Sequence, residues 1–341
     1  MTPQRGHAKH GYPPLDHYTE VTNRIVAALE AGTPPWRKPW NSCKTGNPAM
    51  PRNAVTGRHY RGVNVVTLAA SPLALTSGDP RWATYKQTAD RGWQVKKGAC
   101  GTTAYFFKRI EVPQPAQPPE DDSQTKTRGI AVLRAFTLFH ASQIEGIPAF
   151  TPATAAEAPW LADDATEIIV ANTGVAIEIG GDRAFYAPGT DKVHMPPRHA
   201  FRTAAAWSST ILHECSHATS RVSRLDRDLG RSAFGSPDYA REELRAELAQ
   251  VMVCAELGIA ECEFSNSAAY VECWAETLRS DRKEIFRAAA EAQRIADYLL
   301  AYHPDYAARH QNTVTAAEDP PAAFCPPASA WPPDKSLARR S

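Results

Sequence analysis

The stretch Ile211-Leu212-His213-Glu214-Cys215-Ser216-His217 holds two histidines four residues apart, with a glutamate directly after the first. Residues four apart on an α-helix lie on the same face, one turn from each other. His213 and His217 can therefore offer imidazole nitrogens to one metal ion, and Glu214 can reach a water molecule bound to that ion. The spacing predicts a helix that carries a metal site.

This site needs a third protein ligand, because a catalytic zinc ion takes three and leaves one position for water. A third histidine six residues after the second is excluded, since that position is Ser223. The helix-like segment 238–250 supplies Glu243 and Glu247, which lie one turn apart on a shared face. One can bind the metal while the other accepts a hydrogen bond from a ligand histidine. The residues alone leave open which glutamate does which.

The predicted cofactor is Zn²⁺, or another divalent metal such as Mn²⁺, and the matching chemistry is hydrolysis. A metal ion of this kind lowers the pKa of its bound water to about 7. Glu214 is the candidate to take the proton and pass it to the leaving amine. Tyr239, at the start of the glutamate segment, is the candidate hydrogen-bond donor to the oxyanion.

The bulk composition is that of an ordinary globular chain of 341 residues, 43% of them hydrophobic and 22% charged. No apolar run approaches the roughly 18 residues that a membrane span needs, and the first residues have no apolar signal segment. Seven cysteines, an odd number without close pairing, favour a reducing compartment over a disulfide scaffold. The sequence therefore predicts a cytoplasmic protein with no membrane contact.

Charge divides the chain in two. Residues 1–150 hold 19 Lys and Arg against 10 Asp and Glu, a net charge of +9, and residues 151–341 hold 19 against 27, a net charge of −8. In the basic half, aromatic rings alternate with cations, a composition typical of surfaces that stack the bases and follow the phosphates of single-stranded DNA. The candidate DNA-contact residues are Trp36, Arg37, Lys38, Trp40, Arg58, Tyr60, Arg61, Lys86, Lys96 and Lys97.

The pattern of segments predicts an α+β protein of two domains. Residues 1–18 are expected to be a disordered lead-in, residues 19–150 a mixed α/β domain for single-stranded DNA with a mobile insertion at 111–128, and residues 151–160 a linker. Residues 161–310 are expected to form a mostly helical metal-binding domain with a small sheet, and residues 311–341 a disordered tail rich in proline.

Several segments, in this order, resemble the ArdC-type antirestriction family. They are Pro35-Trp36-Arg37-Lys38-Pro39-Trp40, Tyr60-Arg61-Gly62-Val63-Asn64, Trp82-Ala83-Thr84-Tyr85-Lys86-Gln87, Gly92-Trp93-Gln94-Val95-Lys96-Lys97-Gly98, then the histidine stretch, Glu242-Glu243-Leu244 and Asp281-Arg282-Lys283. The resemblance covers residues 19–302. It implies a single-stranded-DNA-binding domain followed by a zincin-like metallopeptidase domain, in a plasmid-borne protein that protects incoming DNA from restriction. The glutamate segment also resembles that of gluzincin metallopeptidases, which implies Glu243 as the metal ligand and Glu247 as the residue that orients a histidine.

Three hypotheses follow. The first is an antirestriction protein that coats single-stranded DNA, with a protein substrate or a restriction enzyme as a further partner. The second is a DNA-tethered zinc metalloprotease that cleaves DNA-bound proteins, or an accessory protein of conjugation and priming, because a similar N-terminal domain precedes the primase of some TraC-type conjugative proteins. The third is a module in which the metal only stabilises the fold.

Overall fold

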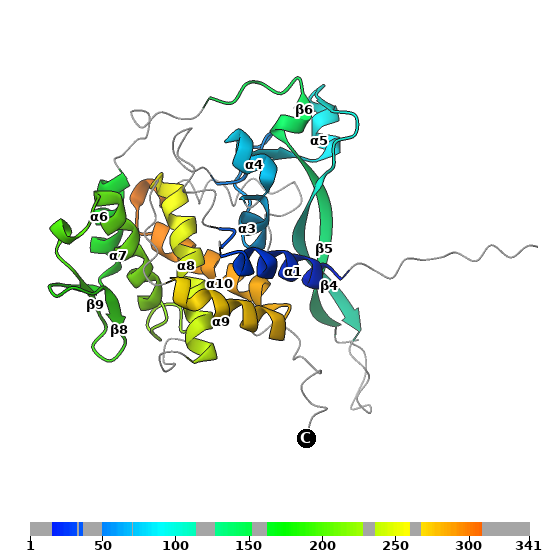
Figure 1. Ribbon diagram of the computed structural model, residues 1–341. Coiled ribbons are helices and arrows are strands. Elements are labelled where there is room, and N and C mark those ends of the chain that lie inside the picture. The colour runs from blue at the N-terminus through cyan, green and yellow to red at the C-terminus, as the bar shows by residue number, and fades with distance from the viewer. Residues whose placement is uncertain are drawn as a thin grey trace, which may run out of the picture.

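The computed structural model describes residues 16–32, 34–36, 50–69, 71–113, 127–151, 162–227, 236–259 and 267–308. A long two-stranded ribbon, β4–β5, runs along one side of the molecule, and a layered group of helices with a small sheet forms the other (Figure 1). The N-terminal helix α1 lies between the two (Figure 1).

The N-terminal part is built on an antiparallel ribbon. Its strands β4 (Thr102–Pro113) and β5 (Thr127–His140) pair from Thr102 opposite Leu138 to Pro113 opposite Thr127, within a four-stranded sheet of order β1-β2-β5-β4. A two-stranded sheet, β3 with β6, sits near the end of the ribbon where β4 begins. The other elements are α1 (His17–Glu30), β1 (Arg52–Asn53), α3 (Val63–Ala69), α4 (Pro72–Ser77), β2 (Arg81–Ala83), α5 (Tyr85–Asp90), β3 (Gln94–Val95), η1 (Ala141–Gln143) and β6 (Ile144–Glu145).

One asparagine ties this sheet to its helix. The side-chain amide of Asn64, in α3, donates to the carbonyl oxygen of Tyr105 at 2.6 Å and accepts from the Tyr105 N–H at 2.8 Å. Both Asn64 and Tyr105 are buried. The two bonds therefore pair the backbone N–H and C=O of Tyr105, which would cost free energy if they were buried without a partner. Asn64, one of the residues that carry the family resemblance, therefore has a structural role.

Within the described residues, the C-terminal part consists of five α-helices and a three-stranded sheet of order β7-β9-β8. The central strand β9 (Lys192–Met195) runs parallel to β7 (Ala176–Ile179) and antiparallel to β8 (Phe185–Ala187). Its helices are α6 (Ala162–Thr173), α7 (Ala204–Ala218), α8 (Pro237–Leu257), α9 (Ser267–Ser280) and α10 (Glu284–Leu300), with the short η3 (Arg198–Ala200) before α7. Helix α8 begins with a Ser236 cap and Pro237 and ends at Gly258, whose φ of 74° suits glycine.

A single apolar core joins the two parts. Val21, Ile25 and Leu29 of α1 belong to the same buried cluster as Phe286 of α10 and the apolar residues of α7 and α8. Polar contacts reinforce the packing, since the Thr22 hydroxyl donates to the Arg282 carbonyl oxygen at 2.9 Å. The two domains are therefore packed against each other through apolar surface and do not merely share a flexible connection.

These observations confirm the predicted two-domain α+β fold and refine its details. The first helix begins at His17 and is capped by Asp16, so it starts inside the expected lead-in. The two ends of the expected insertion, 111–113 and 127–128, continue the paired strands. Its middle, residues 114–126, lies outside the described residues, as do 152–161 and the tail from 309 onward.

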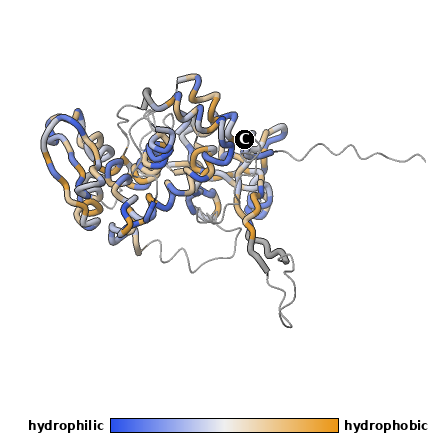
Figure 2. Tube along the Cα trace, turned by 90° about the horizontal axis from the view of Figure 1, so that it is seen from below, coloured by the Kyte–Doolittle hydropathy of each residue, from blue (hydrophilic) through white to orange (hydrophobic). Residues whose placement is uncertain are grey.

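No helix among the described residues is long and apolar enough to cross a membrane. Figure 2 shows the reason, because apolar and polar stretches alternate along the helices. The four cysteines within those residues, Cys100, Cys215, Cys254 and Cys273, are free thiols.

Candidate metal centre

The three predicted ligands converge where α7 packs against α8. One ligand atom each from His213, His217 and Glu243 lie within 4.8 Å of one another. The two Nε2 atoms are 3.1 Å apart, and the Glu243 carboxylate oxygens lie 3.5 Å from Nε2 of His213 and 3.6 Å from Nε2 of His217. Two ligand atoms about 2.1 Å from a tetrahedral zinc ion are about 3.4 Å apart. The observed separations fit that geometry.

Each histidine is held by a second side chain through its other ring nitrogen. Nδ1 of His213 lies 3.2 Å from Oε1 of Gln250, and Nδ1 of His217 lies 3.2 Å from Oε1 of Glu242. The Gln250 amide nitrogen donates to the Ser209 carbonyl oxygen at 3.0 Å, so its oxygen must face His213 as an acceptor. Both Nδ1 atoms therefore carry a proton, and both Nε2 atoms are left as acceptors.

The two Nε2 atoms and the Glu243 carboxylate together form a site that suits a metal ion. In the neutral form, two Nε2 lone pairs point into the same space 3.1 Å apart and next to a carboxylate. Lone pairs in such proximity repel one another unless a cation lies between them. Two imidazoles and one carboxylate are also the donor set that a catalytic zinc site uses. The residues present fit a divalent metal.

The electrostatics of the cluster favour positive charge at the same point. Burial opposes protonation of His213, but the hydrogen bond with Glu243 and the charges of Glu214, Glu243 and Glu247 outweigh it and raise its pKa to about 9. Burial likewise opposes ionisation of Glu243, but the two histidines and the Tyr239 hydroxyl lower its pKa to about 2. Positive charge bound among these ligands is therefore compensated by the carboxylates around it.

A buried ion pair supports the His217 side of the site. Arg227 donates to both oxygens of Glu242, at 2.6 and 2.8 Å, and to the Ser216 carbonyl oxygen at 3.0 Å. Arg227 and Glu242 each expose only 5% of their side chains, so this bidentate pair is shielded from water. It keeps Glu242 ionised, and the pKa of Glu242 is lowered although burial opposes this.

Glu247 lies beside the cluster but differs from its predicted role. The Nδ1 atoms of the two histidines face Gln250 and Glu242, whereas Oε1 of Glu247 accepts a hydrogen bond from the indole N–H of Trp36 at 2.8 Å. The orienting partners are therefore Gln250 and Glu242. Glu247 instead contributes negative charge that raises the pKa of His213.

The two predicted catalytic side chains lie close to the ligands. Glu214 is buried, and its charge contributes to the raised pKa of His213. The Tyr239 hydroxyl donates a hydrogen bond to Glu243 and its ring lies 5.9 Å from that of Tyr270. Burial and the neighbouring Glu243 charge raise the pKa of Tyr239, so it stays protonated and remains a donor.

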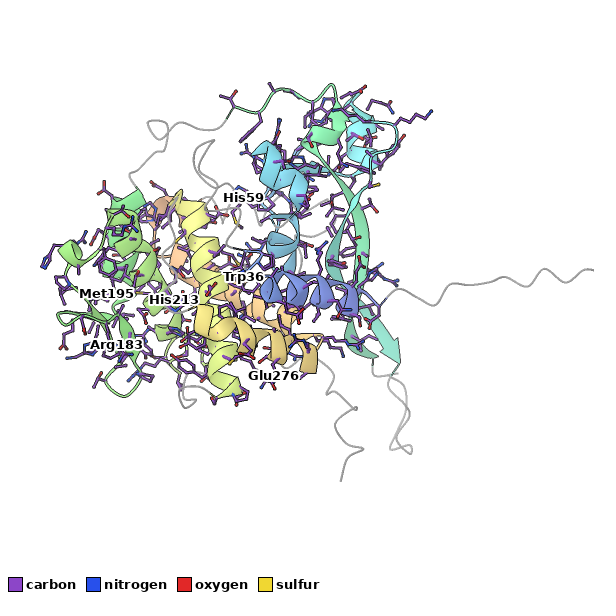
Figure 3. All side chains as sticks on the ribbon, viewed as in Figure 1. Trp36, His59, Arg183, Met195, His213 and Glu276 are labelled. Atoms are coloured by element: carbon purple, nitrogen blue, oxygen red, sulfur yellow. The ribbon has the colours of Figure 1, made fainter. Side chains whose placement is uncertain are left out.

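Two of the predicted DNA-contact residues have other roles in the structure. Trp36 is only 1% exposed, packs against Trp274 with ring centroids 5.9 Å apart and bonds to Glu247, so it cannot stack on a base. Figure 3 shows Trp36 and His213 both lying beside α8. Arg61 forms an ion pair with Asp297 of α10. The prediction for Trp36 is therefore corrected, because its side chain is buried. The prediction for Arg61, whose side chain is 26% exposed, stays a prediction.

The other predicted DNA contacts divide by exposure. Tyr60 packs beside the small apolar cluster around Trp82, and burial raises its pKa to about 12. Arg58 is half-buried, whereas Lys86, Lys96 and Lys97 are exposed. Arg37, Lys38 and Trp40 lie outside the described residues.

Sequence reasoning did not find Gln250, Arg227 or the role of Glu242. Gln250 lies seven residues after Glu243 on α8, two turns along the same face, so helical spacing could have identified it. Arg227 follows α7 in an irregular segment and approaches Glu242 only through tertiary packing. No local pattern marks it.

Comparison with known proteins defines the class to which this geometry belongs. Residues 164–291 match the model of a zincin-like metallopeptidase family, which agrees with the histidine pair on α7 and the glutamate on α8. Residues 15–139 match the model of the N-terminal domain of the anti-restriction factor ArdC. The chain therefore pairs an ArdC N-terminal domain with a zincin-like domain.

Solved structures and curated relatives identify the family. The metal-free and Mn(II)-bound crystal structures of the antirestriction protein ArdC from plasmid R388 are similar, with TM-scores of 0.68 and 0.65 and identities of 38% and 37%, over 85% of this chain and 99% of theirs. An uncharacterized protein, y4eC, of Sinorhizobium fredii (strain NBRC 101917 / NGR234) is 37% identical over 86% of this chain and 94% of its own length. This chain belongs to the ArdC antirestriction family.

Two further relatives are much longer proteins. Two DNA primases named TraC, both from Escherichia coli, are 41% and 39% identical over 84% and 85% of this chain. The chain spans only 27% and 20% of their lengths.

Proposed function

We propose that this protein protects incoming DNA from restriction by binding it as a single strand through residues 19–150, in the cytoplasm, while residues 161–310 hold a divalent metal. The observation that carries the proposal is the union, in one chain, of an ArdC N-terminal domain with the cluster of His213, His217 and Glu243. Exposed Lys86, Lys96 and Lys97 supply charge for phosphate contacts.

The proposed metal is Zn²⁺ or Mn²⁺, held by His213, His217 and Glu243. The donor set suits zinc, and a relative with 37% identity has been crystallised with Mn(II). When bound, such an ion acidifies a coordinated water molecule and polarises a carbonyl group. Gln250 and Glu242 hold the imidazoles in the tautomer that exposes Nε2.

A second candidate function is metal-dependent proteolysis of DNA-bound proteins. The observation that favours it is the placement of Glu214 and Tyr239 beside the ligands, since hydrolysis needs a proton acceptor and an oxyanion donor there. In this role Glu214 takes a proton from the attacking water and delivers it to the leaving amine, and Tyr239 donates to the developing oxyanion.

The variant Glu214→Gln separates the two functions. It keeps the shape of the side chain and all three ligands, so metal affinity and DNA affinity should remain unchanged while any hydrolysis stops. The measurement is the transformation efficiency of unmodified plasmid DNA into a restricting host that carries either form of the protein. Protection that survives the substitution supports coating of DNA, and protection that is lost supports proteolysis.

Binding to DNA is measured on the full chain by fluorescence anisotropy with single-stranded and double-stranded oligonucleotides. We expect tighter binding of the single strand and an affinity that falls steeply with salt, because phosphate contacts release counterions. A chain that prefers the duplex, or whose affinity does not respond to salt, would refute single-strand coating.

A further inference from the structure

Helix α5 carries an aromatic ring that is exposed to solvent and does not contribute to the capping of the helix. Tyr85, the first residue of α5, is 60% exposed. The helix is instead stabilised at this end by a capping box between Thr84 and Gln87, and its one buried residue is Thr88. An aromatic side chain left this exposed forgoes most of the burial that aromatic rings usually contribute, and its face is free to stack.

A second ring lies next to the first. The ring of Phe139, near the end of β5, is half-buried and meets Tyr85 edge-to-face, with centroids 6.4 Å apart. Gly101 approaches the same place from the start of β4. A Cβ atom on Gly101 would lie 2.1 Å from Cγ2 of Thr137 and 3.5 Å from the Phe139 ring. The backbone of Gly101 therefore borders the ring, and the absence of a side chain there leaves the surroundings of Phe139 less crowded.

Lys96 and Lys97 lie on a segment that is bonded to the residues just after Phe139. The Lys96 ammonium donates to the Ser142 carbonyl oxygen at 2.8 Å, and Gln143 donates to the Cys100 carbonyl oxygen at 2.9 Å. These bonds hold segment 96–101 along the residues that directly follow Phe139. Figure 1 shows α5 and β6 at the same end of the ribbon. Lys96 and Lys97 directly follow β3, which pairs with β6.

The charge of this surface suits an anionic partner. Segments 85–101 and 137–145 contain four Lys and Arg residues (Lys86, Arg91, Lys96, Lys97) against two carboxylates (Asp90, Glu145), a net charge of +2. One of those carboxylates, Asp90, is paired with Lys86 at 2.6 Å. An exposed aromatic ring and cations on the same surface are the two elements that sequence-tolerant binding of single-stranded nucleic acid requires.

We propose that Tyr85 and Phe139, bordered by Lys96, Lys97 and Gly101, form a stacking platform for the bases of single-stranded DNA. The bases stack on the Tyr85 ring, and the lysines contact the phosphates on either side. This inference rests on the proposed function and adds to it the surface that holds the strand. It replaces the buried ring of Trp36 with the exposed ring of Tyr85.

The test uses the full chain and a fluorescein-labelled 20-nucleotide oligothymidylate, followed by anisotropy over a range of salt concentrations. Tyr85→Ala should weaken binding about tenfold, because one base loses its stacking partner. The slope of log affinity against log salt should stay unchanged, since no charge is removed. Lys97→Gln should instead lower that slope by about 0.7, the value for one phosphate contact on a single strand.

Two controls separate stacking from other effects. Tyr85→Phe keeps the ring and should bind as the unmodified chain does, whereas Phe185→Ala removes a comparably exposed ring (43%) from β8, in the other domain, and should change nothing. Thermal unfolding of Tyr85→Ala should match that of the unmodified chain because the side chain is exposed.

The outcomes distinguish this inference from the proposed function. If the unmodified chain binds the oligonucleotide and Tyr85→Ala binds equally well, the platform is refuted while DNA binding stands. If Tyr85→Phe loses as much affinity as Tyr85→Ala, a hydroxyl contact replaces stacking and the platform is again refuted. If the unmodified chain binds no oligonucleotide, the proposed DNA binding fails, and the platform fails with it.

Discussion

The metal centre and the surface around α5 contrast in almost every physical property. The ligands of the metal centre are largely buried, lie on two long packed helices and have their ring nitrogens held by Gln250 and Glu242. The surface around α5 is exposed, lies on a six-residue helix and short strands, and carries the exposed lysines Lys86, Lys96 and Lys97. The first is organised to hold one small ion, and the second suits a long, variable polymer.

The contrast separates two kinds of sequence signal, residue spacing and residue composition, by how well each predicts where a side chain lies in the fold. The histidine pair and the two candidate glutamates were identified by spacing, and spacing on a helix fixes direction in space. The DNA-contact residues were identified by composition, which carries no direction. A tryptophan between cations can therefore be a base-stacking residue or, as Trp36 is, a buried partner of Glu247.

The largest effect should come from removing a ligand. We expect His217→Ala to weaken binding of Zn²⁺ by about a thousandfold, because loss of an outer partner alone typically costs 10- to 100-fold. Isothermal titration calorimetry measures this, with His199→Ala, an exposed histidine in η3, as the matched control. Affinity for single-stranded DNA should not change. Unaltered zinc affinity would show that the ion binds elsewhere.

Next in size is the loss of the buried ion pair behind His217. Arg227→Met should lower the free energy of unfolding by about 3 to 5 kcal/mol, because it leaves the buried charge of Glu242 unpaired. Urea denaturation measures the change, and Arg202→Met provides an exposed arginine for comparison. A loss below about 1 kcal/mol, the value of a surface pair, would contradict the shielded environment of this pair.

A smaller effect on stability is expected at Trp36, which was predicted to stack on a base but is a buried partner of Glu247. Trp36→Phe keeps a buried ring but removes a hydrogen bond to a carboxylate, so it should cost about 1.5 to 3 kcal/mol of stability. Trp82→Phe is the control, because Trp82 is equally buried and its indole N–H has no hydrogen-bond partner among the described residues. The excess cost of Trp36→Phe over this control measures the bond to Glu247. Reduced DNA affinity without reduced stability would restore Trp36 as a stacking residue.

The smallest effect should come from Arg61. Its ion pair with Asp297 is partly exposed, with 26% and 32% of the side chains accessible, so Arg61→Gln should cost less than about 1 kcal/mol of stability. Affinity for single-stranded DNA and its salt slope should both stay unchanged. A slope reduced as much as in Lys97→Gln would show that Arg61 contacts phosphate after all.

More of the secondary structure could be predicted in the C-terminal part than in the N-terminal part. The helices of the C-terminal part and the strands at 176–179, 185–187 and 192–195 follow from periodicity and turn residues, because each depends on contacts close in sequence. The paired extension of β4 and β5 around the expected insertion could not be predicted, because strand pairing depends on a partner and not on local preference. The single core that includes α1 was also not visible, since amphipathicity shows that a helix buries a face but not against what.

From the sequence alone, helical spacing placed His213 and His217 on one helix face, and Glu243 and Glu247 on one face of another helix. The choice of Glu243 over Glu247 as the candidate ligand came from the resemblance to gluzincins. The sequence also determined the family, through motifs that occur in a fixed order. Only the tertiary structure decided which glutamate and which amide orient the histidines, that Arg227 secures Glu242, and that Trp36 and Arg61 lie at contacts between the domains. The physical reason is that a side chain's role depends on burial and on partners distant in sequence, and these exist only once the chain has folded.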